Sequence, residues 1–390
     1  MKRPPNSSFR FMIGSQYFLY FGVLGIFLPY FNLYCYHLGF SGFQIGALSA
    51  LRTAATVLFP LVWGALADRF QIRRPIYILC NFVSTGIWVF YLYTADFWVM
   101  LAITLFYGIF YAPIISFLEA FTMDVLDSEK KSYGRIRVWG SLSFITIVMV
   151  VGKIIDLHSI KIILSLILWG SMFQAGISIG IPKLTIDKKK SFKTGAHDLL
   201  RMRVIIFFFS AFLMLVSHGT YYGFFSIHLE NLGYRNTFIG FAWALASTAE
   251  IIVMIRSDKI FKRFSFENVL VFSFIIAAIR WFTLYFVRSP VLILITQVTH
   301  AVTYGTFHIA SILYIDSLTP DEAKTLGQAA NNAVSYGLGI MVGFFLNGYL
   351  YERVGSSALF VLSGLIAIAG GTLFLGFQLF ELRLTTVSSE

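Results

Sequence analysis

Long apolar stretches recur from one end of this chain to the other, and they constrain its fold more than any other feature. Each is about 18 residues or longer, enough for a helix to cross a hydrocarbon core of roughly 30 Å. A membrane barrel would instead show short segments of alternating hydrophobicity. We therefore predict an all-α membrane protein with twelve transmembrane helices, at about residues 8–36, 42–66, 75–93, 97–122, 134–155, 160–181, 204–230, 236–256, 266–286, 291–314, 324–350 and 356–380.

The overall composition agrees with this interpretation. Hydrophobic residues make up 57% of the chain and charged residues 13%, whereas about a quarter of the residues are charged in an ordinary soluble domain. The segments between the predicted spans are too short to form a separate soluble domain. We therefore expect a multi-pass protein of the inner or plasma membrane that has the lipid bilayer as its main contact.

The formal net charge of +11 is distributed unevenly along the chain. With a cytoplasmic N-terminus, 22 of the 30 Lys and Arg residues fall in cytoplasmic segments, five fall outside and three lie within spans. This asymmetry follows the positive-inside rule. It predicts that both termini are cytoplasmic, and it explains the basic surplus without nucleic-acid binding.

Several functional classes lack their sequence signatures here. The chain has no phosphate-binding glycine loop, its seven His residues show no metal-ligand spacing, and Cys35 and Cys80 stand outside any motif. No arrangement of a nucleophile with a base is evident. We therefore expect neither an enzyme nor an ATP-driven pump, and we predict no cofactor and no metal.

The chain divides into two related halves. We predict an N-terminal six-helix bundle at 1–182, a cytoplasmic linker at 183–203 and a C-terminal six-helix bundle at 204–390. The stretches "YGIFYAPIISFLE" (107–119) and "YGTFHIASILYID" (304–316) share a Tyr-Gly-x-Phe start and an acid twelve residues after the tyrosine. Two such repeats around a central cavity are typical of secondary transporters, which bind their substrate near the middle of the membrane.

The loop "GALADRFQIRRP" (64–75) carries a second signal. Its Asp68, Arg69 and Arg73 resemble the Gly-x-Leu-x-Asp-Arg loop of the major facilitator superfamily, although Gln71 stands where a glycine is usual and should alter the turn. An acid at a helix end beside a cationic cluster can hold neighbouring helices together. We therefore predict that these three residues form a conformational latch.

Charged residues lie inside the apolar stretches, where an arginine costs roughly 3 kcal/mol or more. Glu119 and Arg137 are eighteen residues apart, and a helical hairpin would bring them to similar depth. Either they form a purely structural salt bridge or they act together on a substrate. Arg135 points to a different helix face from Arg137 and should stay at the cytoplasmic end. Arg52 is a third cation within the predicted spans, besides Arg137 and Arg280.

Polar side chains repeat at helical spacing in the second half, on the spans near Glu250 and Arg280. Such a face can serve helix–helix contacts, but several of them together indicate the wall of a water-filled cavity. The candidate residues on these faces are Tyr221, His300, Tyr304, Asn331 and Asn332.

These charged residues carry a more specific resemblance. "LEAF" followed by "YGRIRVWG" is similar to lactose permease, and "GIFLP", "YYGF" and "RW" are similar to the 3-phenylpropionate permease group. The resemblance implies that Glu119 and Arg137 bind substrate and that Glu250, Arg280 and His300 couple it to protons. Two positions differ from lactose permease. Phe144 replaces a tryptophan that stacks on the sugar, and Thr303 replaces a second coupling acid.

The sequence thus predicts a monomeric, proton-coupled symporter that imports a small organic solute. An aromatic acid such as phenylpropionate is the expected substrate, bound by Glu119, Arg137, Phe144, Arg52, Tyr221, Tyr304, Asn331 and Asn332, with Glu250, Arg280 and His300 carrying the proton coupling. The alternatives are symport of a saccharide or nucleoside, and an exporter or uncoupled facilitator.

Overall fold

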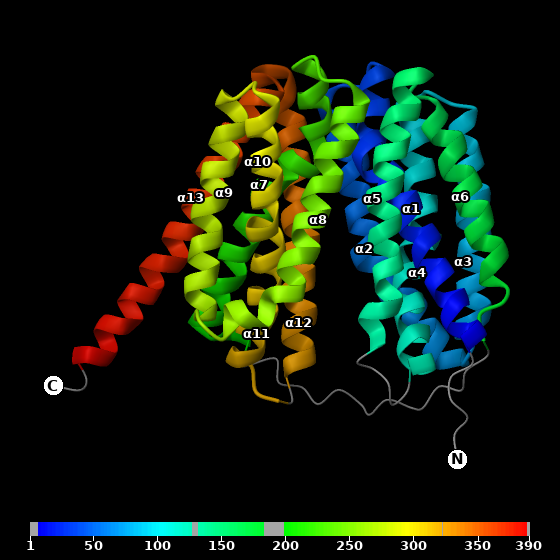
Figure 1. Ribbon diagram of the computed structural model, residues 1–390. Coiled ribbons are helices and arrows are strands. Elements are labelled where there is room, and N and C mark those ends of the chain that lie inside the picture. Colours follow the sequence, from blue (N-terminus) through cyan, green and yellow to red (C-terminus); the bar gives the residue numbers. More distant parts are fainter. Residues whose placement is uncertain (1–6, 127–131, 183–198, 322, 388–390) are drawn as a thin grey trace. The chain divides into compact units, whose positions relative to one another are not determined.

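The computed structural model describes residues 7–126, 132–182, 199–321 and 323–387, and within these ranges it is helical throughout, without strands. The first half contains α1 (Ser7–His37), α2 (Gly42–Phe70), α3 (Arg73–Trp88) with the short η1 (Val89–Leu92), α4 (Phe97–Leu126), α5 (Tyr133–Leu157) and α6 (Ile162–Ser178). The second contains α7 (Met202–Asn231), α8 (Asn236–Phe261), α9 (Phe266–Phe286), α10 (Pro290–His300), η4 (Ala301–Thr306), α11 (Phe307–Leu318), α12 (Lys324–Asn331), η5 (Asn332–Gly339) and α13 (Ile340–Val387). The predicted all-α fold is confirmed (Figure 1).

The elements of the second half combine into longer rods. α10, η4 and α11 follow one another without a gap, and so do α12, η5 and the start of α13. α13 is broken at Gly355, whose φ of 74° lies in the left-handed region that glycine adopts without strain. Nine stretches among the described residues are long and apolar enough to cross a membrane. The break at Gly355 divides the last of these stretches into two spans, and the shorter α6 and the rod of α10, η4 and α11 supply two more. Each predicted span in the described ranges therefore corresponds to one helical rod.

The chain forms two compact units. Unit 1 comprises residues 1–189 together with Gly233–Ala244, and unit 2 comprises the remainder. In unit 1, α1 packs against α5 and α6, and α2 packs against α4. In unit 2, α7 packs against η5 and α13, which contain the last two predicted spans. The first helix of each half therefore contacts the last two rods of that half. The predicted linker at 183–203 lies mostly outside the described residues, so the predicted domain boundaries stay a prediction.

Side-chain hydrogen bonds compensate for irregular backbone in unit 1. Pro113 in the middle of α4 has no N–H to donate to the carbonyl of Ile109. The indole Nε1 of Trp63 on α2 donates to that carbonyl at 2.8 Å. In a similar way, Asp156 at the end of α5 accepts backbone N–H groups of Asn236 at 2.8 Å and Thr237 at 2.9 Å. Pro113 lies within a span, where hydrocarbon offers no water, so the bond from Trp63 keeps the Ile109 carbonyl satisfied.

Arg73 connects three helices at one end of unit 1. Its guanidinium lies 3.5 Å from Asp68 of α2 and 2.8 Å from Asp124 of α4. Arg69 contacts the ring of Phe70 and pairs with no acid among the described residues. Gln71 adopts a φ of 55°, so the turn keeps a left-handed conformation without the usual glycine, contrary to the expected change. The latch function of Asp68, Arg69 and Arg73 stays a prediction.

Arg74 contributes a further link on the same turn. Its side chain donates to the carbonyl oxygens of Ile179, at 2.6 Å, and Ile181, just after the end of α6. These carbonyls have no partner within the helix. Two consecutive arginines therefore tie the start of α3 to α2, α4 and α6.

We predict that Arg73→Gln destabilises the protein, because Asp68 and Asp124 then lose their shared cation. The loss should be about 1 kcal/mol, the upper range for a partly exposed pair. Arg69→Gln, which removes an equal charge from the same turn, should leave the stability unchanged. Thermal unfolding of both variants in detergent measures this difference. Equal stability of the two variants would contradict the assignment of the connection to Arg73.

Candidate functional site

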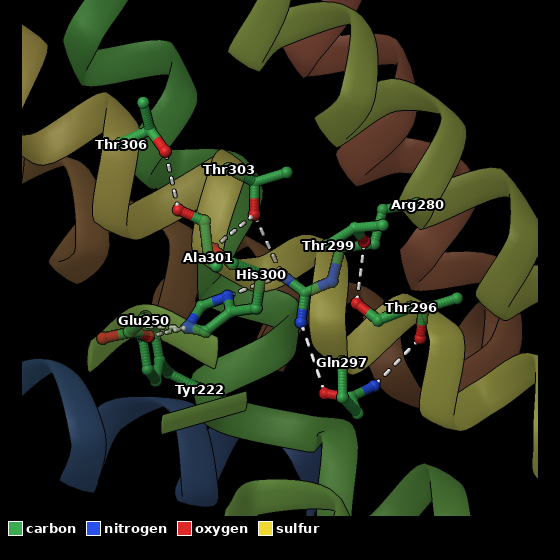
Figure 2. Close-up of polar contacts among 10 residues, drawn as sticks. All are labelled: Tyr222, Glu250, Arg280, Thr296, Gln297, Thr299, His300, Ala301, Thr303 and Thr306. Atoms are coloured by element: carbon green, nitrogen blue, oxygen red, sulfur yellow. Dashed lines mark hydrogen bonds and ion pairs between the residues drawn. The ribbon is translucent and has the colours of Figure 1, made fainter. Parts of the chain in front are cut away.

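A chain of polar contacts in unit 2 links Arg280 on α9 to Glu250 on α8 through His300, the last residue of α10 (Figure 2). The Nη1 of Arg280 lies 2.7 Å from Nδ1 of His300. The Nε2 of the same imidazole lies 2.7 Å from a carboxylate oxygen of Glu250. The side chain of His300 is 3% exposed and that of Glu250 is 23% exposed. The three residues that the sequence predicts for proton coupling therefore lie in direct contact.

This arrangement determines where His300 carries its proton. Arginine is only a donor, so Nδ1 must accept the bond from Arg280. The remaining ring proton of a neutral imidazole is then on Nε2, where it is donated to Glu250. A second proton on Nδ1 would face the Arg280 donor directly. His300 thus acts as a neutral bridge between a cation and a carboxylate.

Arg280 is held by further polar and aromatic contacts. Its Nη1 also donates to the hydroxyl of Thr303 at 3.2 Å, and its Nη2 donates to the amide oxygen of Gln297 at 3.4 Å (Figure 2). Its guanidinium lies over the rings of Tyr221, at 4.4 Å from the centroid, and Trp281, at 4.5 Å. Thr303 therefore accepts a hydrogen bond at the position where the resemblance places a second acid.

Gln297 is not among the residues that the sequence predicts for the site. It lies three residues before His300, so helical spacing puts both on one face, and this signal was available. The amide nitrogen of Gln297 in turn donates to Thr296 at 2.9 Å. These bonds fix the orientation of the amide whose oxygen receives Arg280.

Two π-helical segments, η4 and η5, flank this network, and the sequence did not predict them. η4 begins directly after His300, and the side-chain hydroxyl of Thr306 donates to the carbonyl of Ala301, five residues earlier, at 3.0 Å. Gly305 of η4 packs closely against the Glu250 side chain, because a Cβ there would lie 3.5 Å from Glu250 Cγ. Single π-helical turns inside α-helices are frequent at functional sites.

Neutral polar side chains gather around the same segments. Tyr304 stacks on His300, with ring centroids 5.3 Å apart, and the rings of His308 and Tyr336 meet edge to face at 4.9 Å. Two buried atoms here have no hydrogen-bond partner among the described residues, His308 Nδ1 and Asn331 Nδ2, while the hydroxyl groups of Ser311 and Tyr336 lie beside each other. A buried polar group without a partner costs about 1–3 kcal/mol. This cluster can therefore bind water or polar ligand groups favourably.

The predicted substrate residues of unit 2 are divided between two environments. Tyr221 and Tyr304 both contact the ring of His300. Asn331 is fully buried and accepts a hydrogen bond from Ser335 at 3.1 Å. Asn332, the next residue, is exposed. The structure thus separates the two neighbouring asparagines that the sequence grouped together.

Glu119 on α4 and Arg137 on α5 form no ion pair within 4.0 Å, which disfavours the purely structural salt bridge. Glu119 is an exposed residue of α4, and Arg137 is its electrostatic neighbour. The guanidinium of Arg137 lies 3.8 Å from the centroid of the Phe21 ring on α1. Arg135 is exposed and Arg137 is partly buried, as the helical spacing predicts. The joint action of Glu119 and Arg137 on a substrate stays a prediction.

Phe144 and Arg52 complete the predicted residues of unit 1. Phe144 is 8% exposed and packs against Gly25 on α1, where an added Cβ would come within 3.4 Å of its ring. Its ring is therefore part of the packing between α1 and α5. Arg52 on α2 is partly buried and lies over the ring of Phe27, 4.6 Å from the centroid.

These residues can bind charged and polar ligands and can hold a proton. Among the described residues, no group of three or more His, Cys, Asp and Glu side chains gathers as a metal site. The contacts described above are hydrogen bonds, an ion pair and aromatic contacts.

Comparisons with known proteins identify the family of this chain. The chain is 26% identical to the "Probable 3-phenylpropionic acid transporter" of Escherichia coli (strain K12), over 89% of this chain and 92% of that protein. It is 24% identical to the maltose permease of Geobacillus stearothermophilus, over 91% of each chain. Its fold matches a crystal structure of the nucleoside transporter NupG with a TM-score of 0.82, at 17% identity, over 94% of this chain and 98% of that one. The model of the MFS_1 like family matches residues 11–362. The chain therefore belongs to the MFS_1 like family and is a multi-pass membrane transporter of the major facilitator type, not an enzyme.

Proposed function

We propose that this transporter lies in the plasma membrane with both termini in the cytoplasm and imports a small aromatic acid together with protons. The single observation that carries the coupling is the direct chain from Arg280 through His300 to Glu250. The choice of an aromatic acid such as 3-phenylpropionate is supported by the relative that bears this name and by the arginines Arg52, Arg137 and Arg280.

Glu250 carries the translocated proton in this proposal. His300 is engaged on both ring nitrogens, so it has no free lone pair to accept a proton while Arg280 is bound. Glu250 has a second carboxylate oxygen and is partly exposed, so a proton can reach it from water. Protonation removes its negative charge while Arg280 keeps its positive charge.

The change in charge at Glu250 couples proton binding to conformational change. While Glu250 is ionised, it balances Arg280 through the imidazole and holds α8, α9 and α10 together. Once Glu250 is neutral, this balance is lost and another arrangement of the helices becomes favourable. A ligand shifts such an equilibrium only through its different affinity for the two states. In this proposal the proton is that ligand, because it binds Glu250 more tightly in the second arrangement. Release of the proton to the cytoplasm restores the ionised state.

Substrate binding rests on Glu119 and Arg137 in unit 1. Both charged groups lie within the membrane-spanning helices, and neither has an ion-pair partner within 4.0 Å among the described residues. A ligand with hydrogen-bonding groups would satisfy the carboxylate and the guanidinium together. Arg137 offers a planar fork that binds paired oxygens, which are present in a carboxylate and in a sugar diol.

Symport of a saccharide is the second candidate. The observation that favours it is the neutral cluster of His308, Ser311, Asn331 and Tyr336, in which His308 Nδ1 and Asn331 Nδ2 have no partner among the described residues and could bind hydroxyl groups. The maltose permease relative points in the same direction. An exporter or uncoupled facilitator would differ in transport, because its uptake into vesicles would not follow an imposed proton gradient.

We expect purified protein to be stabilised against heat by 3-phenylpropionate and not by disaccharides. A ligand at a hundred times its Kd raises the free energy of unfolding by about 2.7 kcal/mol. A thermal-shift series with aromatic acids, sugars and nucleosides measures this. Stabilisation by maltose or a nucleoside alone would contradict the aromatic acid as substrate and would favour a saccharide or nucleoside instead.

We predict that Glu250→Gln abolishes accumulation of substrate against its gradient but leaves exchange across vesicles intact, because exchange needs no net release of a proton. The amide keeps the shape of the side chain and can still accept from His300. Glu267→Gln, a matched change on α9 outside the network, should accumulate substrate normally. Accumulation by Glu250→Gln with an unchanged pH profile would transfer the coupling role elsewhere, first to Glu119.

We predict that Glu119→Gln and Arg137→Lys each abolish substrate binding while the protein still inserts into the membrane. A lysine carries the charge but cannot reproduce the planar fork. Arg135→Lys makes the same change two residues away on an exposed side chain and should bind normally. Isothermal titration of each purified variant measures the affinity. Near-normal affinity in both single variants would assign the pair a structural role.

A further inference from the structure

Helix α8 begins without a cap from its own sequence. Its first residue is Asn236, and Arg235 stands just before it, at the position where Ser, Thr, Asp or Asn usually accepts the first N–H groups of a helix. Helices α2 and α9 do have such caps, because Ser41 accepts from the start of α2 and Ser265 from the start of α9. The first N–H groups of α8 therefore need an acceptor from another part of the fold.

Asp156, near the end of α5, supplies this acceptor. Its Oδ1 accepts from the backbone N–H of Asn236 at 2.8 Å and from the side-chain amide of Asn236 at 3.3 Å. Its Oδ2 accepts from the backbone N–H of Thr237 at 2.9 Å and from the Thr237 hydroxyl at 2.6 Å. The Asp156 side chain is only 6% exposed, and its negative charge is favoured at the start of a helix, where the backbone dipole is positive. The carboxylate thus holds the start of α8 on the end of α5.

The backbones of α5 and α8 also approach each other closely beside these bonds. A Cβ added to Gly152 of α5 would lie within 3.0 Å of the carbonyl of Asn236, and one added to Gly240 of α8 would lie within 3.0 Å of the carbonyl of Val148. The hydroxyl of Tyr30 on α1 donates to the same Val148 carbonyl at 2.9 Å. Closely packed surfaces of this kind switch between discrete arrangements and do not slide continuously. The start of α8 is therefore either docked on α5 or detached from it.

Helix α8 is divided between the two compact units. Residues Gly233–Ala244 belong to unit 1, and the rest of the helix, including Glu250, belongs to unit 2. Transporters built from two related bundles work largely by moving one bundle against the other. A helix that both units share cannot keep all its contacts during such a movement. Its contact with Asp156 is polar and involves the exposed residue Thr237, so water can replace the hydrogen bonds when the contact opens.

We propose that Asp156 is a releasable clasp, which holds the start of α8 on α5 in one state of the transport cycle and releases it in the other. Asp156 is a positioning residue in this role, because it acts through the position of α8, the helix that carries Glu250. The inference requires that the protein transports a solute, but it depends neither on the identity of that solute nor on proton coupling by Glu250. No covalent change is involved.

The first experiment measures hydrogen–deuterium exchange of the full-length protein in detergent, and it needs no substrate. In wild type, the backbone N–H groups of Asn236 and Thr237 should exchange slowly, because Asp156 accepts them. Asp156→Ala should raise exchange in the peptide 233–244 by about tenfold or more, the range for loss of a hydrogen bond to a charged group. Unchanged exchange in this peptide would contradict the clasp.

Asp96→Ala is the matched control for this measurement. Asp96 also accepts an N–H at the start of a helix, that of Val99 in α4 at 3.0 Å, but within its own stretch of chain. This variant should raise exchange at the start of α4 and leave the peptide 233–244 as in wild type. Arg235→Gln removes an exposed cation 3.8 Å from Asp156 and should also leave that peptide unchanged. Faster exchange of 233–244 in Asp96→Ala would contradict the assignment to Asp156, because the effect would then be a general loss of stability.

The second experiment asks whether the contact must open during transport, which a purely structural cap would not do. Asp156→Cys with Thr237→Cys is reconstituted into vesicles and linked by a short bis-methanethiosulfonate reagent that a reductant cleaves. The two native cysteines are buried. Linking should lower uptake of 3-phenylpropionate at least tenfold, and the reductant should restore it. Lys153→Cys with Arg235→Cys links two exposed residues of the same contact while Asp156 stays in place, so the test does not depend on a variant without the clasp.

Asn231→Cys with Tyr351→Cys is the matched pair. These side chains lie 3.4 Å apart on α7 and α13, both within unit 2, so this link should leave uptake unchanged. Normal uptake by both linked α5–α8 pairs would show that the contact stays closed throughout the cycle and would overturn the proposal. If wild type takes up maltose or a nucleoside but no 3-phenylpropionate, the proposed substrate fails while the clasp does not, and the linked pairs are measured with the compound that is taken up.

Discussion

The cost of an unpaired charge or polar group in a low-dielectric, water-poor environment governs this structure at every level. Backbone groups are satisfied inside helices, and where Pro113 removes a donor the indole of Trp63 replaces it. The same cost makes ionisable residues inside the spans informative, since each must have a partner or a ligand. The arrangement of these few charges therefore indicates what the transporter does more directly than its many apolar contacts.

The arginines within the spans are compensated to different degrees, and the differences are consistent with different roles. Arg280 is enclosed by His300, Gln297, Thr303 and two aromatic rings. Such a guanidinium is held in one geometry and is suited to respond to the charge of Glu250. Arg137 and Arg52 contact aromatic rings and form no ion pair among the described residues. A rigid cation suits proton coupling, whereas cations without an ion-pair partner suit ligand binding.

The π-helical segments add a further feature beside the coupling network. A π-helical turn changes the face on which the following side chains lie, and η4 begins just after His300. Tyr304, Gly305 and His308 are consequently presented beside Glu250 and Tyr336. Polar groups without partners in this region are a source of stored free energy that water or substrate can release. The region thus combines a fixed ion-pair network with an adaptable polar surface.

The sequence alone was sufficient for the fold class and for the candidate charges. Apolar stretches of membrane-spanning length require helices, because isolated strands would leave backbone groups without partners in lipid. An arginine or glutamate within such a stretch is conspicuous, so Glu250, Arg280 and His300 were found by position and resemblance.

Only the tertiary structure decided which of these groups touch. Spacing along one helix shows which residues share a face, but the distance between faces of different helices depends on how the helices pack. The sequence therefore did not reveal that Thr303 and Gln297 complete the contacts of Arg280, that Phe144 is buried against Gly25, or that Gln71 retains the left-handed turn. Nor did it show that Arg52 has no acid beside it, since that absence is a property of all the neighbouring helices together.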